Sequence, residues 1–574
     1  MSAFSTIREA LKDMLKGVGK LFGARTIERT LNVAPCISSQ MESAITLWSL
    51  MYKNESPWLH EATDFDSSRV TSLGLPAMIA SEKARTALLE FEMEITTPTK
   101  EVEVKNPDYD PEPKTDFFGN VIPSSQPEFI TEDKPKTNTK RAEYLEEQKE
   151  KLLRDLRKQL EYGIAKGGLV IKPYVVVKKT KDGKNREIVS YDMEFDYIQA
   201  DCFYPLAFNA SGEITEAAFL ETKVQGDVTY RKLEYHKWEN NSVIVKNKAF
   251  KSTTSGVSAD LSGVDLGQEV NLGEVPEWKD LAQSTKIAPI EKPLFAYFKM
   301  PEANTIDTMS PLGVSGFSRA TALIKDADIQ YSTLLWEYEG GQMAIDIDRD
   351  ALEFVTNEGS KMSMLQNRLY RTVDLGESDT YNPYAPQLRD SNYIEGLNTI
   401  LMRIEDVCCI SRGTLSDASE VAKTATELKI LKQRSYQANK DIQSTLERTL
   451  DDVVFIMNAY CDLYQITPDG EYDVSYQWDD SILVDIDEEL NKKMLLLQNG
   501  LMSKSEVRQW YFGETERQAQ EALLAVDDEN KQQMEDDLAM QSNQFNMQQQ
   551  FGGGQPKSNN NNNDKKSKEN IQKS

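Results

Sequence analysis

Residues 424–467 read TATELKILKQRSYQANKDIQSTLERTLDDVVFIMNAYCDLYQIT, within a run from Thr414 to Thr467 that contains neither glycine nor proline. Apolar residues recur along this run at Leu428, Leu431, Ile442, Leu446, Leu450, Val453, Met457, Tyr460 and Tyr464. This helical spacing predicts one long helix, and about 42 helical residues make a rod ~60 Å long. Such a length favours a spine that bridges several lobes. A coiled coil is the competing interpretation, although the heptad is not strictly kept.

Two shorter helices are predicted upstream of this spine. The first covers Ser318–Glu339 and stops at a glycine pair, and the second runs from about Asn392 to Ile410. Between them, the alternating residues of Gln342–Asp348 have the spacing of a strand. Two helices around the mixed pattern of residues 340–391 indicate a stalk that carries a tip.

The first 317 residues are predicted to combine helices with a β-rich region. Helical patterns cover residues 1–95, including Leu73–Glu94, and recur at Arg141–Ala165. Between them, Pro98–Lys140 lacks sustained periodicity, which predicts a long insertion or mobile loop. An antiparallel meander is predicted next, with strands at Leu169–Lys179, Glu187–Tyr197, Glu213–Lys223, Asp227–Trp238 and Ser242–Phe250. Residues 252–272, rich in Ser, Gly and Asp, are expected to form another exposed loop.

The C-terminal part of the chain is acidic. Residues 468–540 hold 19 Asp and Glu against 6 Lys and Arg, with short helical patterns at Leu490–Met502, Lys504–Phe512 and Thr515–Ala525. We predict a small acidic helical domain here. Residues 541–574 have the low-complexity composition typical of a disordered tail. The predicted fold class is therefore α+β and mostly helical.

Charge and composition exclude several functions. The 574 residues carry 66 Lys and Arg against 93 Asp and Glu, a formal net charge of −27, and the histidines are His60 and His236 alone. A protein that coats DNA needs a positive electrostatic footprint, so this class is excluded. The two histidines lie in unrelated segments and leave almost no room for histidine-based metal sites or a Ser-His-Asp triad.

Targeting signals are not expected either. The five cysteines have no C-x-x-C spacing, which indicates free thiols in a reducing compartment. The amphipathic N-terminus lacks the continuous apolar core of a signal peptide, and no apolar run approaches the roughly 18 residues of a membrane span. We expect this N-terminal helix to pack on a partner or on its own domain rather than on a membrane surface.

No catalytic motif is complete in this sequence. It contains no G-x-x-x-x-G-K-[ST], no H-E-x-x-H and no G-x-S-x-G. Asp346, Asp348 and Asp350 are spaced like the start of a calcium loop, but Ala351 and Asn357 stand where glycine and glutamate are needed. Their alternation instead favours the exposed face of a strand. A two-metal nuclease needs clustered carboxylates, for which the candidates are Asp479, Asp480, Asp485 and Asp487; solvated acidic surface is the commoner cause of such runs.

The order of elements resembles the portal proteins of tailed double-stranded DNA bacteriophages, in particular long-tailed phages of Gram-positive hosts. The likeness is carried by Ile37–Met41 with Trp48, Tyr52 and Pro57–Leu59, by Gly167–Tyr174, Gln199–Pro205, Leu312-Gly313 with Ser315, Pro386–Arg389, Ser411–Ser416 and Lys423–Leu428. These motifs are short and not catalytic. The more specific feature is the order of two helices around a small insertion and then a very long helix. The likeness covers most of residues 1–530, except the two predicted loops.

The resemblance implies a portal fold of wing, stem, clip and crown that assembles into a ring, with twelve subunits in the phage. It assigns residues 1–317 and the spine helix 424–467 to the wing, 318–339 and 392–410 to the stem, 340–391 to the clip, 411–423 to the tunnel loop and 468–540 to the crown. Such a ring is a channel for genome packaging by a separate terminase ATPase and for DNA ejection. No enzymatic activity and no cofactor are therefore expected.

The implied partners are further copies of the chain, the terminase large subunit, a head–tail adaptor, the major capsid and scaffold proteins, and double-stranded DNA bound without sequence recognition. No membrane is implied, and the expected location is the portal vertex of the virion, after assembly in the host cytoplasm. An acidic conduit suits this role because retained phosphate contacts would resist the movement of DNA.

The candidates for residues that face DNA in the channel are Arg412, Leu415 and Lys423. For the two basic residues, ordinary surface charge is an equally good interpretation. Asp346, Asp348 and Asp350 are the candidates for partner docking at the clip. Two other function classes stay open at this point. One is a metal-dependent nuclease, and the other is a helical scaffold or adaptor that does not form a ring.

Overall fold

The computed structural model describes residues 23–59, 70–105, 114–115, 121–122, 129–181, 187–252, 266–341, 344–348, 353–355, 361–363, 370–373, 381–384, 387–417, 425–478, 486–513, 519–520 and 522–526. The chain divides into two compact units, of which the first ends at Asp479 and the second begins at Asp480. The first unit combines helices and sheets, so the α+β prediction is confirmed. No helix among the described residues is long and apolar enough to cross a membrane.

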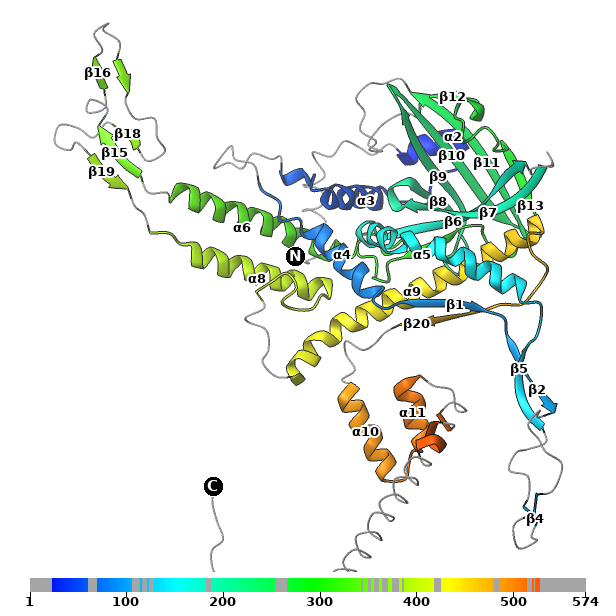
Figure 1. The fold of residues 1–574 in the computed structure, drawn as a ribbon. Helices are drawn as coiled ribbons and strands as arrows, with labels where there is room; N and C mark the ends of the chain where they lie inside the picture. Colours follow the sequence, from blue (N-terminus) through cyan, green and yellow to red (C-terminus); the bar gives the residue numbers. More distant parts are fainter. Residues whose placement is uncertain are drawn as a thin grey trace, which may run out of the picture. The chain divides into compact units, whose positions relative to one another are not determined.

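The longest helix, α9, runs over 40 residues from Ala425 to Tyr464 (Figure 1), as the sequence pattern predicts. Six of its buried apolar side chains recur every three or four residues and so share one face: Ile442, Leu446, Leu450, Val453, Met457 and Cys461. This face packs against α4 (Leu75–Ala87), α5 (Lys140–Lys166) and two strands, β6 (Gly168–Lys181) and β14 (Ala296–Lys299). One continuous helix therefore joins the helices and a sheet of the first unit in a single core.

All five predicted strands are present and antiparallel, but they belong to two sheets rather than to one meander. The larger sheet has the order β12-β11-β10-β9-β8, with β13 also paired to β11. Its strands are β8 (Phe203–Phe208), β9 (Ile214–Gln225), β10 (Val228–Glu239), β11 (Ser242–Ser252), β12 (Gln268–Val270) and β13 (Ser284–Ile287). The smaller sheet pairs β14 with β6 and β6 with β7 (Glu187–Gln199). Helix α5 packs on β6 and β7 and ends at Gly167, whose φ of 89° lies in the left-handed region that glycine favours.

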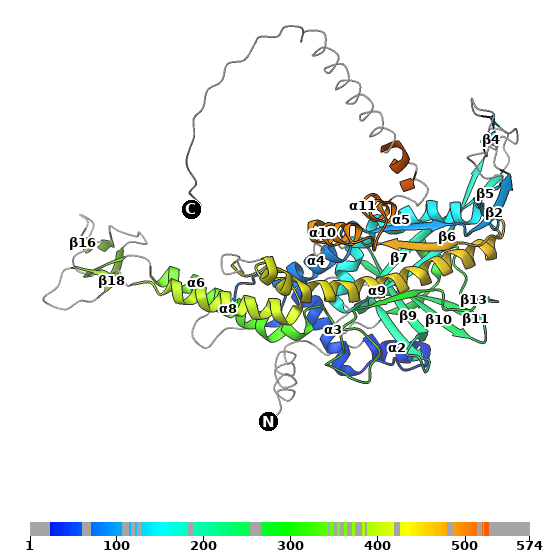
Figure 2. The same cartoon turned by 90° about the horizontal axis from the view of Figure 1, so that it is seen from below.

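Helices α6 (Thr321–Gly340) and α8 (Asp390–Cys408) pack side by side, as both views show (Figures 1 and 2). The chain between them forms short strands: β15 (Ala344–Asp348), β16 (Glu353–Val355), β17 (Lys361–Ser363), β18 (Tyr370–Val373) and β19 (Tyr381–Tyr384). β15 is the central strand of a three-stranded sheet, parallel to β18 and antiparallel to β19. The predicted strand at Gln342–Asp348 is thus confirmed over its last five residues.

The predicted helix at Leu73–Glu94 was too long. Helix α4 ends at Ala87, and Glu92–Thr96 forms strand β1, which pairs with β20 (Asp473–Gln477). Alternation explains the strand, because Met93 and Ile95 are buried while their neighbours are exposed. The ring of Phe91 also stacks on Trp478, with centroids 4.3 Å apart. Residues 473–478 therefore belong to the first unit. The start predicted for the acidic domain, residue 468, was too early in the chain.

The segment Pro98–Lys140 is not a structureless loop throughout. Strand β2 (Thr99–Lys105) pairs with β5 (Phe129–Pro135), and β3 (Lys114–Thr115) pairs with β4 (Val121–Ile122). The alternating valines in Thr99–Lys105 are a strand pattern that the Pro- and Asp-rich composition around them obscured.

The remaining described elements are short helices and single turns. Near the N-terminus are helices α2 (Gly23–Leu31) and α3 (Ser39–Tyr52), and single 3-10 turns occur at Pro57–Leu59, Ala200–Cys202, Leu272–Glu274 and Ser318–Ala320. The second unit contains α10 (Ile486–Gln498) and α11 (Lys504–Phe512), near the first two of its three predicted helices. The predicted tail at 541–574 and most of the loop at 252–272 lie outside the described residues.

Candidate functional site

The candidate site begins where helix α8 ends and the chain turns towards α9. Cys409 stands at this end with a φ of 56°, in the left-handed region. The backbone carbonyl of Glu405 accepts hydrogen bonds from the N–H groups of Cys409 and Ile410. Such bonds satisfy the last carbonyls of a helix and turn the chain away from its axis. The segment Ser411–Asp417, which contains two of the candidate channel positions, therefore leaves the helix in a fixed direction.

The carboxylate of Glu405 holds this segment against the helix. The side chain is completely buried. One of its oxygens accepts the N–H groups of Leu415 and Ser416 at 2.6 and 2.9 Å, and the other accepts the Ser416 hydroxyl at 2.7 Å. A buried carboxylate is tolerated when donors surround it in this way. Glu405 thus fixes the path of the segment through both its backbone and its side chain.

Arg412 lies beside the other acidic residue in the last turns of α8. Its Nη2 and Nε donate to the two carboxylate oxygens of Asp406, at 2.9 and 3.3 Å. Two further guanidinium groups approach the same carboxylate, from Arg403 at 3.8 Å and from Arg434 of α9 at 4.0 Å. The hydrogen bonds from Arg412, and then the charges of the three arginines, lower the pKa of Asp406. We call Arg403, Arg412 and Arg434 the arginine cluster.

The arginine cluster carries an excess of positive charge on an accessible surface. Three guanidinium groups surround one carboxylate, and the side chains of Arg403 and Arg434 are 70% and 67% exposed. A guanidinium group keeps its charge at any physiological pH and presents N–H donors in a fork that fits phosphate oxygens. Contacts of this type position a nucleic acid without reading its bases. The arrangement is therefore suited to weak contacts with a phosphate backbone.

The other candidate positions are placed differently. Leu415 is partly buried against the core and offers no polar side-chain atom, and the hydroxyl next to it belongs to Ser416 and is bonded to Glu405. Lys423 lies outside the described residues. Asp346 and Asp348 lie on the central strand β15, and Asp350 is again outside the described part of the chain.

The alternative sites find no support in the described structure. Within the described residues, no group of three or more His, Cys, Asp and Glu side chains is arranged to hold a metal ion. Of the proposed nuclease carboxylates, Asp487 lies on α10, and Asp479, Asp480 and Asp485 lie outside the described ranges, as does His60.

Neither the described histidine nor the cysteines form a reactive site. His236 is buried in the larger sheet, 2.7 Å from a Glu234 oxygen that also accepts Lys172 at 2.7 Å. Burial lowers the pKa of His236, which favours its neutral form. All five cysteines are free thiols, and burial raises the pKa of Cys408 to about 12. His236 and Cys408 are therefore structural.

Sequence reasoning named Arg412 but missed the residues around it. Arg403 and Asp406 come from α8 and Arg434 from α9, so their proximity depends on how the two helices meet. One signal was present: Glu405 and Asp406 are two acids in the last turns of a helix, where the helix dipole disfavours negative charge. Acids at such a position need donors from elsewhere, which here are the amides of Leu415 and Ser416 and the side chain of Arg412.

A family model described as phage portal protein, SPP1 Gp6-like, matches residues 122–544. No curated protein matches the chain. The matched range is well over half of the sequence and includes α6, α8, the segment Ser411–Asp417 and α9. The chain therefore belongs to the SPP1 Gp6-like family of phage portal proteins.

Proposed function

We propose that twelve copies of this portal protein close into a ring at one vertex of the capsid, and that the ring is the channel for DNA. Membership of the family makes the chain a structural component of the tailed-phage virion with a part in genome packaging and in the head–tail connection. Packaging is driven by a separate terminase ATPase, and the same channel later releases the genome. The ring forms in the cytoplasm of the bacterial host, a Gram-positive species.

The parts of the portal scheme follow the order of the elements. Helices α6 and α8 form the stem, residues 340–391 the clip, and residues 411–423 the tunnel loop. The sheets, the N-terminal helices and α9 form the wing, and the second unit belongs to the crown. Helices α6 and α8 pack against each other, and the chain between them forms small sheets. Together with the 40-residue helix that follows, this arrangement supports the assignment.

The arginine cluster is the observation that carries the proposal. It is a local excess of positive charge in a chain whose net charge is −27, and it lies beside the segment that family likeness assigns to the channel wall. Repetition around a ring would give a belt of guanidinium groups. Each phosphate contact releases counterions and strengthens binding, so a few weak contacts on an acidic background centre the duplex without stopping it.

The clip supplies the docking surface for the other parts of the machine. Asp346, Asp348 and Asp350 would meet the terminase large subunit during packaging and the head–tail adaptor afterwards. The major capsid and scaffold proteins would contact the wing. Charged rims of this kind mainly set partner choice and the rate of encounter, which suits a surface that changes partners.

The test is complementation of a phage that lacks its own portal gene. The substitutions Arg403→Gln, Arg412→Gln and Arg434→Gln are combined in one chain, and packaged DNA per particle is measured. We expect particles that contain portal rings but less DNA, because the contacts that guide the duplex are lost. Arg154→Gln on α5, an equally exposed arginine, is the control and should package normally. Unchanged packaging by the triple variant would refute the role of the arginine cluster.

The two alternatives are separated by simple measurements. A nuclease would cleave DNA with magnesium or manganese and lose this activity on Asp346→Ala or Asp479→Ala. A scaffold or adaptor would remain a monomer or dimer in solution. Metal-dependent cleavage or a small assembly would each contradict the channel proposal.

A further inference from the structure

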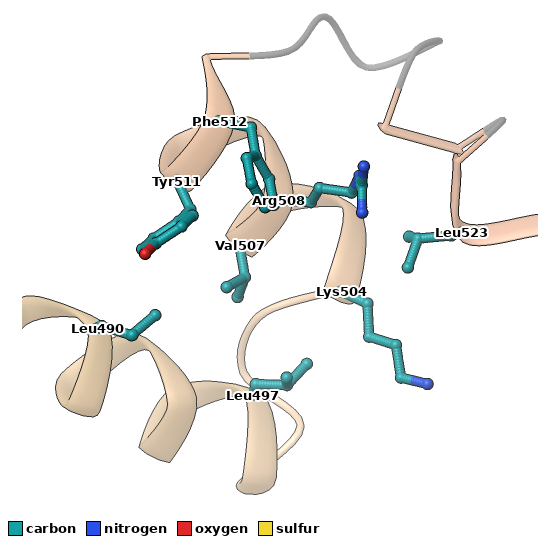
Figure 3. Close-up of a pocket in the computed structure, with 8 residues that line it drawn as sticks. All are labelled: Leu490, Leu497, Lys504, Val507, Arg508, Tyr511, Phe512 and Leu523. Atoms are coloured by element: carbon teal, nitrogen blue, oxygen red, sulfur yellow. The ribbon is translucent and has the colours of Figure 1, made fainter. Parts of the chain in front are cut away.

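We propose that a groove in the second unit binds residues 527–545 of this same chain. The groove lies between α10 and α11 and encloses about 350 Å³. Figure 3 shows its lining, in which apolar side chains of the two helices and of Leu523 point towards one another. The lining residues are Leu490, Leu497, Lys504, Val507, Arg508, Tyr511, Phe512 and Leu523. The inference concerns the second unit alone and does not depend on the channel function.

The second unit leaves much apolar surface uncovered. Tyr511 and Phe512 at the groove are 50% and 60% exposed, and Leu524 next to it is 65% exposed. Among the described residues of this unit, Ala519 is the buried one. Soluble proteins rarely expose contiguous apolar patches unless something covers them. The groove therefore needs an occupant that brings apolar side chains.

The charges of the groove select an acidic occupant. Lys504 and Arg508 are the charged residues of the lining. Residues 527–545 read DDENKQQMEDDLAMQSNQF and carry six acids against one base. The N-terminal segment 1–22 is also amphipathic, but it carries four bases against two acids, the same sign as the groove. Charge complementarity therefore favours the C-terminal segment over the N-terminal one.

The apolar residues of this segment have the spacing that the groove requires. Met534, Leu538 and Phe545 lie four and seven residues apart, a spacing that would put them on one face if the bound segment is helical. Leu490 and Leu497 of α10 are also seven residues apart, about 10 Å along a helix. An amphipathic helix that lays such a face into an apolar groove is a common mode of recognition.

The segment can reach the groove. Leu523 lines it, and Asp527 follows four residues later. Residues 527–533 span up to ~24 Å when extended, which is enough for the chain to turn back and place Met534 over the lining. The family match continues to residue 544. Most of the segment therefore belongs to the part of the chain that the family shares, rather than to the Asn-rich tail.

Binding of a labelled peptide tests the proposal. The peptide has the sequence of residues 527–545 and is added to the chain truncated after Val526, with fluorescence anisotropy as the readout. We expect saturable binding of one peptide per chain, and no binding to the full-length chain, whose own segment fills the groove. Lys504→Glu with Arg508→Glu should weaken binding about ten-fold or more, because two attractive pairs become repulsive. Lys492→Glu, on α10 but outside the lining, is the control and should leave binding unchanged.

Three results would overturn the proposal. The first is equal binding of a peptide with the same composition in scrambled order, which would reduce the interaction to charge alone. The second is equal binding to the truncated and the full-length chain, which would mean that the segment does not occupy the groove. The third is no binding to the truncated chain, as expected if a second copy of the second unit covers the groove.

Discussion

The substitution Glu405→Gln should loosen the segment Ser411–Asp417 while leaving helix α8 in place. Glutamine keeps one carbonyl oxygen for the two amides but loses the charge and presents an NH2 group near the Ser416 hydroxyl. Hydrogen bonds to a charged group contribute roughly 1 kcal/mol more than neutral ones. Three bonds are affected, so we expect the free energy of local opening to fall by about 2–3 kcal/mol.

Hydrogen exchange measured by mass spectrometry reads this change directly. A loss of 2–3 kcal/mol corresponds to exchange roughly 30- to 150-fold faster, and peptides that contain the amides of Leu415 and Ser416 should show it. Peptides from the middle of α8 should exchange as before. Glu395→Gln, an exposed glutamate on the same helix, is the matched control. Acceleration below about three-fold, or equal acceleration in the control, would mean that the Glu405 carboxylate does not hold the segment.

Three further predictions concern the core, a close backbone approach and pH. Leu450→Ala in the buried face of α9 should lower the free energy of unfolding by about 2–5 kcal/mol in urea titrations, whereas Leu463→Ala on the exposed side should change it by less than about 1 kcal/mol; similar effects would refute the burial of that face. Gly313→Ala should lower the melting temperature, because the new Cβ would lie 2.1 Å from a backbone oxygen, while Gly396→Ala meets its nearest atom at 3.5 Å and should not. The pKa of Asp406 is lowered in the folded chain. The stabilisation that its carboxylate gives to the folded chain is therefore fully present above the pKa of the unfolded chain, about 3.9, and is lost as the pH falls through the lower pKa of the folded chain. Hydrogen exchange of residues 411–417, corrected for intrinsic rates, should therefore accelerate only in acid, and Asp406→Asn should accelerate it at pH 7 and remove the pH dependence.

The features that could be predicted from the sequence depend on local periodicity. The apolar stripe of α9, the helices α6 and α8, and the alternation at Ala344–Asp348 each show within a few residues which face is buried. Strands β9, β10 and β11 follow one another in both sequence and sheet, so their antiparallel pairing was also accessible. The resemblance to portal proteins rested on the order of such elements, which is why the family was identified although no single motif is decisive.

The features that were missed depend on contacts between distant residues. Strand β1 was taken for the end of a helix because its partner β20 lies at the far end of the first unit's sequence. The position of Arg434 beside Asp406 requires α9 to return past the end of α8. Leu415 was named for the channel by its place in a loop, yet its side chain packs inward. Local patterns cannot specify which residues from separate helices will meet.

Cryo-electron microscopy of the purified full-length chain tests the central claim most directly. We predict closed rings with a central hole, in which the segment Ser411–Asp417 and the arginine cluster of every subunit lie at the wall of that hole. Monomers or dimers would contradict the account, as would rings that carry the arginine cluster on their outer surface.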